Sequence, residues 1–186
     1  SILVVLYFEK LAARHIASGL LLIIVWAFIE EIIKLGSAYF TTLRSKYFDE
    51  PLDAMVYLIT VALGFAAFEN SLFLIKTLST DANLGVTIAT AGMRFIGATL
   101  LHTLSSAVIG GMIALAYYKT WGYKVLYTII GVLLATLLHT LFNFIIINQG
   151  LLGVEMGVVG VFFVLWISII ILILFFERIK TVIYQA

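Results

Sequence analysis

The sequence predicts an all-α fold: a polytopic membrane helix bundle with five full transmembrane helices and an N-terminal helical fragment. Apolar residues make up 63% of the 186 residues, while charged residues make up only 11%, against roughly 25% in a typical soluble domain. The mean hydropathy is +1.18. The apolar residues form long continuous runs, which favours helices over the alternating strands of a barrel.

Five segments are long enough for the roughly 20 apolar residues that a spanning helix needs. They are residues 16–40, 52–75, 84–118, 125–147 and 151–176. The third is too long for a simple span, so we expect it to tilt, to extend beyond the bilayer, or to break near Gly110 and Gly111. Residues 2–8 are too short to span and are interpreted as the cut end of a longer helix. We predict one transmembrane domain over residues 1–186.

The composition narrows the functional classes and the orientation. The chain has no cysteine, which excludes disulfides, thiol catalysis and cysteine metal sites. The net charge is +1 and no basic tract is present, so no nucleic-acid partner is predicted. The positive-inside rule predicts a multi-pass cell-membrane protein whose C-terminus is cytoplasmic, since one side carries six basic residues and the other three. The first side holds Arg44, Lys46, Lys119, Lys124, Arg178 and Lys180, and the second holds Lys10, Arg14 and Lys76.

Several polar residues lie inside the predicted spans, where such groups are costly and commonly mark function. Helix rise predicts that most of them meet in one water-accessible cavity. Arg94 is about 12 Å along a helix from His102, so we expect it to pair with a carboxylate or to bind a substrate carbonyl. The residues are Glu30, Glu31 and Lys34 in the first span, Glu69 and Asn70 in the second, Arg94 and His102 in the third, and His139 and Asn143 in the fourth.

A structural interpretation of each polar residue is available. A buried glutamate paired with a lysine can simply hold helices together, and a lone buried histidine is more often structural than a ligand. The functional interpretation is favoured because four separate helices each supply a group suited to hydrolysis.

The order and spacing of these residues resemble a known family. Glu30, Glu31 and Lys34 form an EExxK motif, Glu69 and Asn70 end the segment GFAAFEN, and His139 and Asn143 form HxxxN. Over residues 20–145 the pattern resembles the PrsW family of intramembrane proteases, which is related to the prenyl-protein (CAAX) endopeptidases and bacteriocin-processing enzymes. Those relatives carry arginine where Lys34 stands and phenylalanine where Ala98 stands, so the pattern favours PrsW. The resemblance implies site-1 cleavage of a membrane protein such as an anti-sigma factor.

Peptide hydrolysis needs an activated water, a stabilised oxyanion and a proton for the leaving amine. The hypothesis for the eight candidate catalytic residues assigns Glu30 or Glu31 as general base, His102 as its partner in orienting the water, and His139 with Asn143 as oxyanion donors. Glu69 and Arg94 complete the polar cavity, and Lys34 balances the glutamate charges.

A metal-dependent version is equally compatible with the sequence. Glu69, His102 and His139 form a candidate His₂Glu set for zinc, with Glu31 as base. The expected cofactor is therefore either none or a single divalent metal such as zinc. The expected partners are the lipid bilayer and a membrane-protein or peptide substrate.

Other functions fit part of the pattern. Intramembrane carboxylates and histidines also occur in transporters and proton relays, and a CAAX-type prenyl-protein endopeptidase is a further alternative. A membrane cytochrome with His102 and His139 as haem ligands is disfavoured because it leaves Glu30, Glu31 and Asn143 unexplained.

Overall fold

The computed structural model describes residues 2–17, 19–80, 84–147 and 154–183. All regular structure in these residues is helical, which confirms the all-α prediction. The elements are α1 (Ile2–His15), α2 (Leu20–Ala38), the π-helical turn η1 (Tyr39–Leu43), α3 (Asp53–Thr80), α4 (Leu84–Leu115), α5 (Trp121–Ile147) and α7 (Val154–Ile183).

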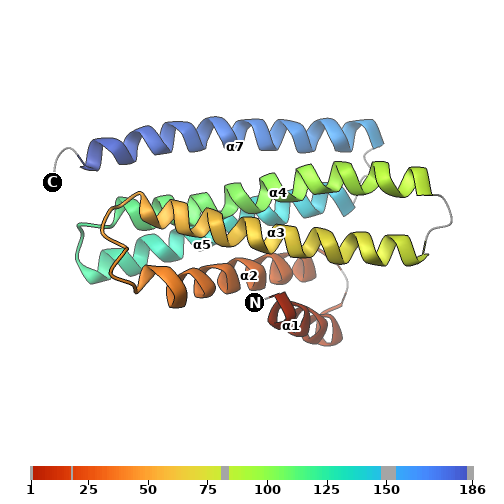
Figure 1. Cartoon of the computed structure of the whole chain (residues 1–186), viewed down its shortest axis with the longest axis horizontal. Helices are drawn as coiled ribbons and strands as arrows, with labels where there is room; N and C mark the ends of the chain where they lie inside the picture. The colour runs from red at the N-terminus through yellow and green to blue at the C-terminus, as the bar shows by residue number, and fades with distance from the viewer. Residues whose placement is uncertain (1, 18, 81–83, 148–153, 184–186) are drawn as a thin grey trace.

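The long helices α2, α3, α4, α5 and α7 form the bundle, and the short α1 lies at a steep angle to them near one end of α2 (Figure 1). The central helix is α4, which packs against α2, α3, α5 and α7. Its inward position explains why the buried polar groups of several helices can meet around it. The connection between η1 and α3, the connection between α4 and α5, and the C-terminal end of α7 lie at the same end of the bundle (Figure 1).

Three helices in the described part of the chain are long and apolar enough to cross a membrane, which supports a membrane protein. Their spanning segments are Asp53–Ser79, Phe95–Leu115 and Trp121–Ile147. The predicted count of five spans is not confirmed by this measure. In α2 the reason is its charge, because Glu30, Glu31 and Lys34 all lie within its 19 residues. The orientation relative to the cytoplasm stays a prediction.

The helix α4 does not break at Gly110 and Gly111, and it ends at Leu115. Gly110 instead lies directly against the backbone of α3. A Cβ atom at this position would lie 2.6 Å from the Cα of Met55 and 2.7 Å from the carbonyl oxygen of Ala54. The glycine therefore allows α3 and α4 to approach more closely than any side chain would permit.

The helix α1 is longer than the predicted fragment and is tied to its neighbours. Ile2 and Val5 are buried against Phe65 of α3. The indole Nε1 of Trp26 on α2 donates a hydrogen bond of 3.1 Å to the carbonyl oxygen of Glu9. Gly19, just before α2, has a φ of +144°, a conformation that favours glycine. These contacts place one face of α1 beside the polar interior of the bundle.

Candidate active site

Three polar residues of α2 face inward and are buried. Glu30 is 7% exposed, and Glu31 and Lys34 are fully buried. The spacing of these residues places them on adjoining parts of one helix surface, which turns toward α4 and α5. All three charged side chains are thus buried within the bundle.

Glu31 accepts three hydrogen bonds at one oxygen. Its Oε1 lies 2.6 Å from the Nζ of Lys34, 2.9 Å from the Oγ of Ser105 and 2.8 Å from the Nδ1 of His139. A carboxylate can only accept here, so Nδ1 of His139 carries the hydrogen. The other ring nitrogen of His139, Nε2, is left with a lone pair.

His102 is held between a carboxylate and an ammonium group. The Nζ of Lys34 donates to its Nδ1 over 3.2 Å, and its Nε2 lies 2.7 Å from the Oε2 of Glu69. Since an ammonium can only donate, Nδ1 is the accepting nitrogen and Nε2–H donates to Glu69. The ring also packs edge-on against Phe65, with centroids 5.2 Å apart.

Glu30 lies between the two histidines. Its Oε2 is 3.9 Å from the Nδ1 of His102 and 3.8 Å from the Nε2 of His139, and the two imidazole rings are 5.1 Å apart. This oxygen is buried and has no hydrogen-bond partner among the residues that the structure describes. One carboxylate oxygen and two imidazole nitrogens therefore converge on one point.

The convergence fits a divalent metal. Glu30, His102 and His139 each offer a ligand atom, and these atoms lie within 4.8 Å of one another. His₂Glu is a common zinc set with an open position. Each histidine also has a carboxylate on its other nitrogen, the outer partner that orients metal-binding imidazoles. Lys34, which contacts Nδ1 of His102, has further acceptors in Glu31 and Ser105.

The expected zinc ligands were Glu69, His102 and His139, but Glu69 is not part of the observed cluster. The cluster contains Glu30, whereas Glu69 contacts the far nitrogen of His102.

Asn143 is half-buried one turn beyond His139 on α5. Arg94 belongs to α4, but its side chain lies outside the described residues. Asn70 donates to the Oγ1 of Thr99 on α4 over 3.3 Å, which is a contact between helices.

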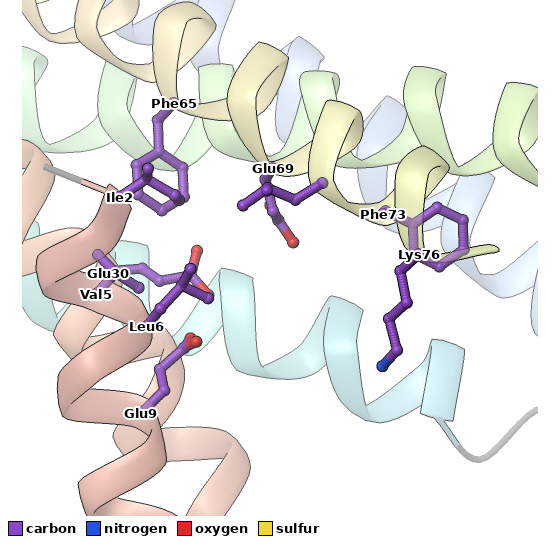
Figure 2. Close-up of a pocket in the computed structure, with 10 residues that line it drawn as sticks. Ile2, Val5, Leu6, Glu9, Glu30, Phe65, Glu69, Phe73 and Lys76 are labelled. Atoms are coloured by element: carbon purple, nitrogen blue, oxygen red, sulfur yellow. The ribbon is translucent and has the colours of Figure 1, made fainter. Parts of the chain in front are cut away.

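Two residues near the centre carried no functional expectation from the sequence. Ser105 is one of them, and its hydroxyl contacts Glu31 and the carbonyl of His102. Its position three residues after His102 was the available signal, because such residues share a helix face. Glu9 reaches in from α1 toward Glu30 (Figure 2). The available signal for Glu9 was that it is the only carboxylate of α1 and directly follows the apolar run of residues 2–8.

A pocket of about 200 Å³ opens onto this cluster. One face of α1 and one face of α3 form its walls, and Glu30 reaches it from α2 (Figure 2). The pocket connects the carboxylate of Glu30 with the outside of the bundle. The lining residues are Ile2, Val5, Leu6, Glu9, Glu30, Phe65, Glu69, Leu72, Phe73 and Lys76.

Comparison with known proteins matches the sequence of this chain to one family. The family model described as "PrsW family intramembrane metalloprotease" matches residues 1–173. Protease PrsW of Geobacillus kaustophilus is 31% identical over 131 residues, which cover 70% of this chain and 54% of that protein. Protease PrsW of Bacillus subtilis is 28% identical over 119 residues, covering 64% and 50%.

Protease PrsW of Clostridioides difficile is 27% identical over 146 residues, covering 77% of this chain and 55% of the relative. The chain thus spans about half the length of the curated relatives it matches. No solved structure matches it. Because the family model covers nearly all of the residues, the chain belongs to the PrsW family of intramembrane metalloproteases.

Proposed function

We propose that this protein is an intramembrane endopeptidase that hydrolyses a peptide bond of a membrane-protein substrate. The observation that carries the proposal is the convergence of Glu30, His102 and His139 at the inner end of a pocket. Family membership supports the same reaction class. An anti-sigma factor is the first substrate class to test, because the motif resemblance implied it.

In a metal-free reaction Glu30 is the general base. Its unpartnered Oε2 takes a proton from the attacking water, whose oxygen forms a bond to the peptide carbonyl carbon. The proton is then delivered to the amine nitrogen as the C–N bond breaks. His102 lies beside this oxygen, with its ring fixed by Glu69 and Lys34, and so orients the water.

The oxyanion needs a hydrogen-bond donor. When the imidazole of His139 is neutral and donates its Nδ1 hydrogen to Glu31, Nε2 has none to offer. The amide of Asn143, one turn farther along α5, is a donor that does not depend on protonation. We therefore assign the oxyanion to Asn143, with His139 joining it only as an imidazolium.

In a metal-dependent reaction Glu30, His102 and His139 would hold the ion. A divalent ion supplies Lewis acidity toward water and the substrate carbonyl. Glu31 and Glu69 then orient the two histidines through their outer nitrogens. The role of base would pass to Glu31, whose Oε2 is buried with no hydrogen-bond partner in the described part of the chain. Lys34 offsets the Glu31 charge in both versions.

The test uses the purified protein in liposomes with a single-span reporter that contains an anti-sigma juxtamembrane segment. Glu30→Gln and His139→Ala should each lower the cleavage rate by roughly 10²-fold or more, while Glu177→Gln, an exposed control, should not change it. Reporter cleavage that is equal in all four proteins would refute the proposal.

Chelation separates the two versions of the mechanism. Loss of activity on chelation, with recovery on adding zinc and one bound zinc per chain by elemental analysis, supports the metal-dependent version. His102→Ala should then abolish the bound zinc. Full activity of metal-free protein supports the Glu30 base.

A further inference from the structure

The residues that line the pocket come mainly from one face of α1 and one face of α3. On α1 its residues are spaced as one helix face, with Ile2, Val5 and Glu9 separated by three and four positions. On α3 the lining runs from Phe65 to Lys76 along one face. Two helix faces, rather than a loop, therefore shape the wall, so the pocket has a defined width.

The buried part of the pocket lining is mostly apolar, but it also includes one carboxylate. Ile2, Val5 and Phe65 are 8%, 2% and 4% exposed, whereas Leu6 is 43% exposed and Lys76 is exposed. Glu30 is the buried charged residue of the lining. A group in the pocket thus contacts hydrocarbon walls next to the carboxylate of Glu30.

The size of the pocket limits its occupant. About 200 Å³ is below the roughly 300–1,000 Å³ of sites that hold whole small-molecule ligands. It suits one large side chain. We propose, on the basis of the function proposed above, that this pocket is the subsite for one large apolar side chain, such as leucine or phenylalanine, next to the scissile bond of an extended substrate segment.

The charges in the pocket are consistent with an apolar occupant. Glu69 is engaged by the Nε2–H of His102, and Glu30 is turned toward both histidines. Glu9 lies on the wall of α1 (Figure 2) and Lys76 on that of α3, so the rim carries one charge of each sign. A cationic side chain would be attracted by Glu9 but repelled by Lys76.

The experiment varies the substrate and the pocket together. The cleaved bond of the reporter is located by mass spectrometry, and the residue on each side of it is replaced by Gly, Ala, Leu, Phe, Trp, Lys or Glu. At one of the two positions, Leu or Phe should raise kcat/KM by about tenfold or more over Gly or Lys, since burial of such a side chain contributes that much. A preference for Lys, or no preference at either position, would overturn the subsite.

Pocket variants show whether this preference arises in the pocket. Leu72→Trp narrows the pocket and should shift the preference to Ala or Gly, whereas Leu72→Ala should admit Trp. Leu74→Trp is the matched control, because Leu74 is on α3 but does not line the pocket, and it should leave the preference unchanged. If Leu72→Trp fails to fold, Leu72→Ala still decides: an unchanged preference in that variant contradicts the subsite.

A binding measurement separates the subsite from the proposed reaction. Fluorescent reporter peptides bind to the Glu30→Gln protein in liposomes, and their Kd values are compared for Leu and Gly. Tighter binding of Leu by about tenfold, lost in the added Leu72→Trp substitution, supports the subsite even if no peptide is ever cleaved. Cleavage by the native protein with equal Kd values for both peptides supports the reaction and overturns the subsite.

Discussion

Replacement of Gly110 by alanine tests the close approach of α3 and α4. The added Cβ would lie 2.6 Å from the Cα of Met55, 2.7 Å from the oxygen of Ala54 and 2.9 Å from the nitrogen of Met55. Ordinary contacts between carbon atoms are about 3.5–4.0 Å. All three neighbours are backbone atoms, so no rotamer change relieves the overlap. The two helices must separate by about 1 Å.

The magnitude follows from two opposing effects. Alanine stabilises a helix by about 1 kcal/mol relative to glycine, while overpacking in a well-packed interior costs about 1–3 kcal/mol, occasionally more. The backbone clash puts Gly110→Ala at the upper end of that range, so we expect a net loss of about 1–2 kcal/mol. Gly64→Ala on α3 is the control, because a Cβ there meets nothing within 4 Å; it should stabilise the protein by up to about 1 kcal/mol.

The assay is reversible unfolding in mixed micelles with increasing sodium dodecyl sulfate, followed by tryptophan fluorescence. A separation of α3 from α4 also stretches the 2.7 Å contact between Glu69 and His102, so zinc binding or cleavage should weaken in Gly110→Ala and not in Gly64→Ala. If the two variants unfold at the same detergent fraction, the close approach of these helices is refuted.

Three further changes test individual contacts. Lys34→Met leaves the buried Glu31 carboxylate without its ammonium and should lower the free energy of unfolding by about 3–5 kcal/mol; unfolding at the native detergent fraction would contradict this pairing. Trp26→Phe removes the hydrogen bond to the carbonyl of Glu9 and should cost about 1 kcal/mol of stability. Amide hydrogen exchange should become faster in α1 but not in α5. Equal changes in both helices would argue against a role of this hydrogen bond in holding α1 to α2. Asp53→Ala removes an acceptor for two backbone amides before α3 and should lower stability by about 1 kcal/mol in a thermal unfolding scan, and an unchanged midpoint would show that this turn does not need its carboxylate.

Much of the helical architecture was predictable because apolar runs longer than a bilayer is thick have few folded alternatives. The glycines of α4 were less informative. A glycine pair can mark a break in a helix or a close approach of a neighbour, and the sequence alone does not say which. Gly110 serves the second role because α3 lies against it. The number of spanning helices could not be fixed from the sequence either. The charged residues of α2 belong to the candidate site, and they make this helix less apolar than a typical membrane span.

The members of the candidate site were largely predictable, but their pairings were not. Spacing on one helix brought Glu31 and Lys34 together, and their contact is 2.6 Å. The choice between Glu30 and Glu69 as the third member of the cluster depends on how α2, α3 and α4 rotate against one another. Side-chain periodicity within each helix carries no information about that rotation. Glu9 was missed for a related reason. It lies near the site because of the angle at which α1 packs against the bundle, and the sequence of α1 does not reveal that angle.

The pairings give a physical account of the consecutive glutamates. Neighbouring residues on a helix project about 100° apart, so Glu30 and Glu31 reach opposite sides of one imidazole: Glu31 contacts Nδ1 of His139 and Glu30 faces its Nε2. His102 then lies between Glu30 and Glu69 in the same way. Carboxylates and imidazoles alternate in a single row, and Glu30 stands at its centre. The outer carboxylates fix the tautomers, which leaves both inner nitrogens as acceptors that face Glu30. A single glutamate on α2 cannot both fix His139 and stand between the two rings, which is a physical reason for the pair.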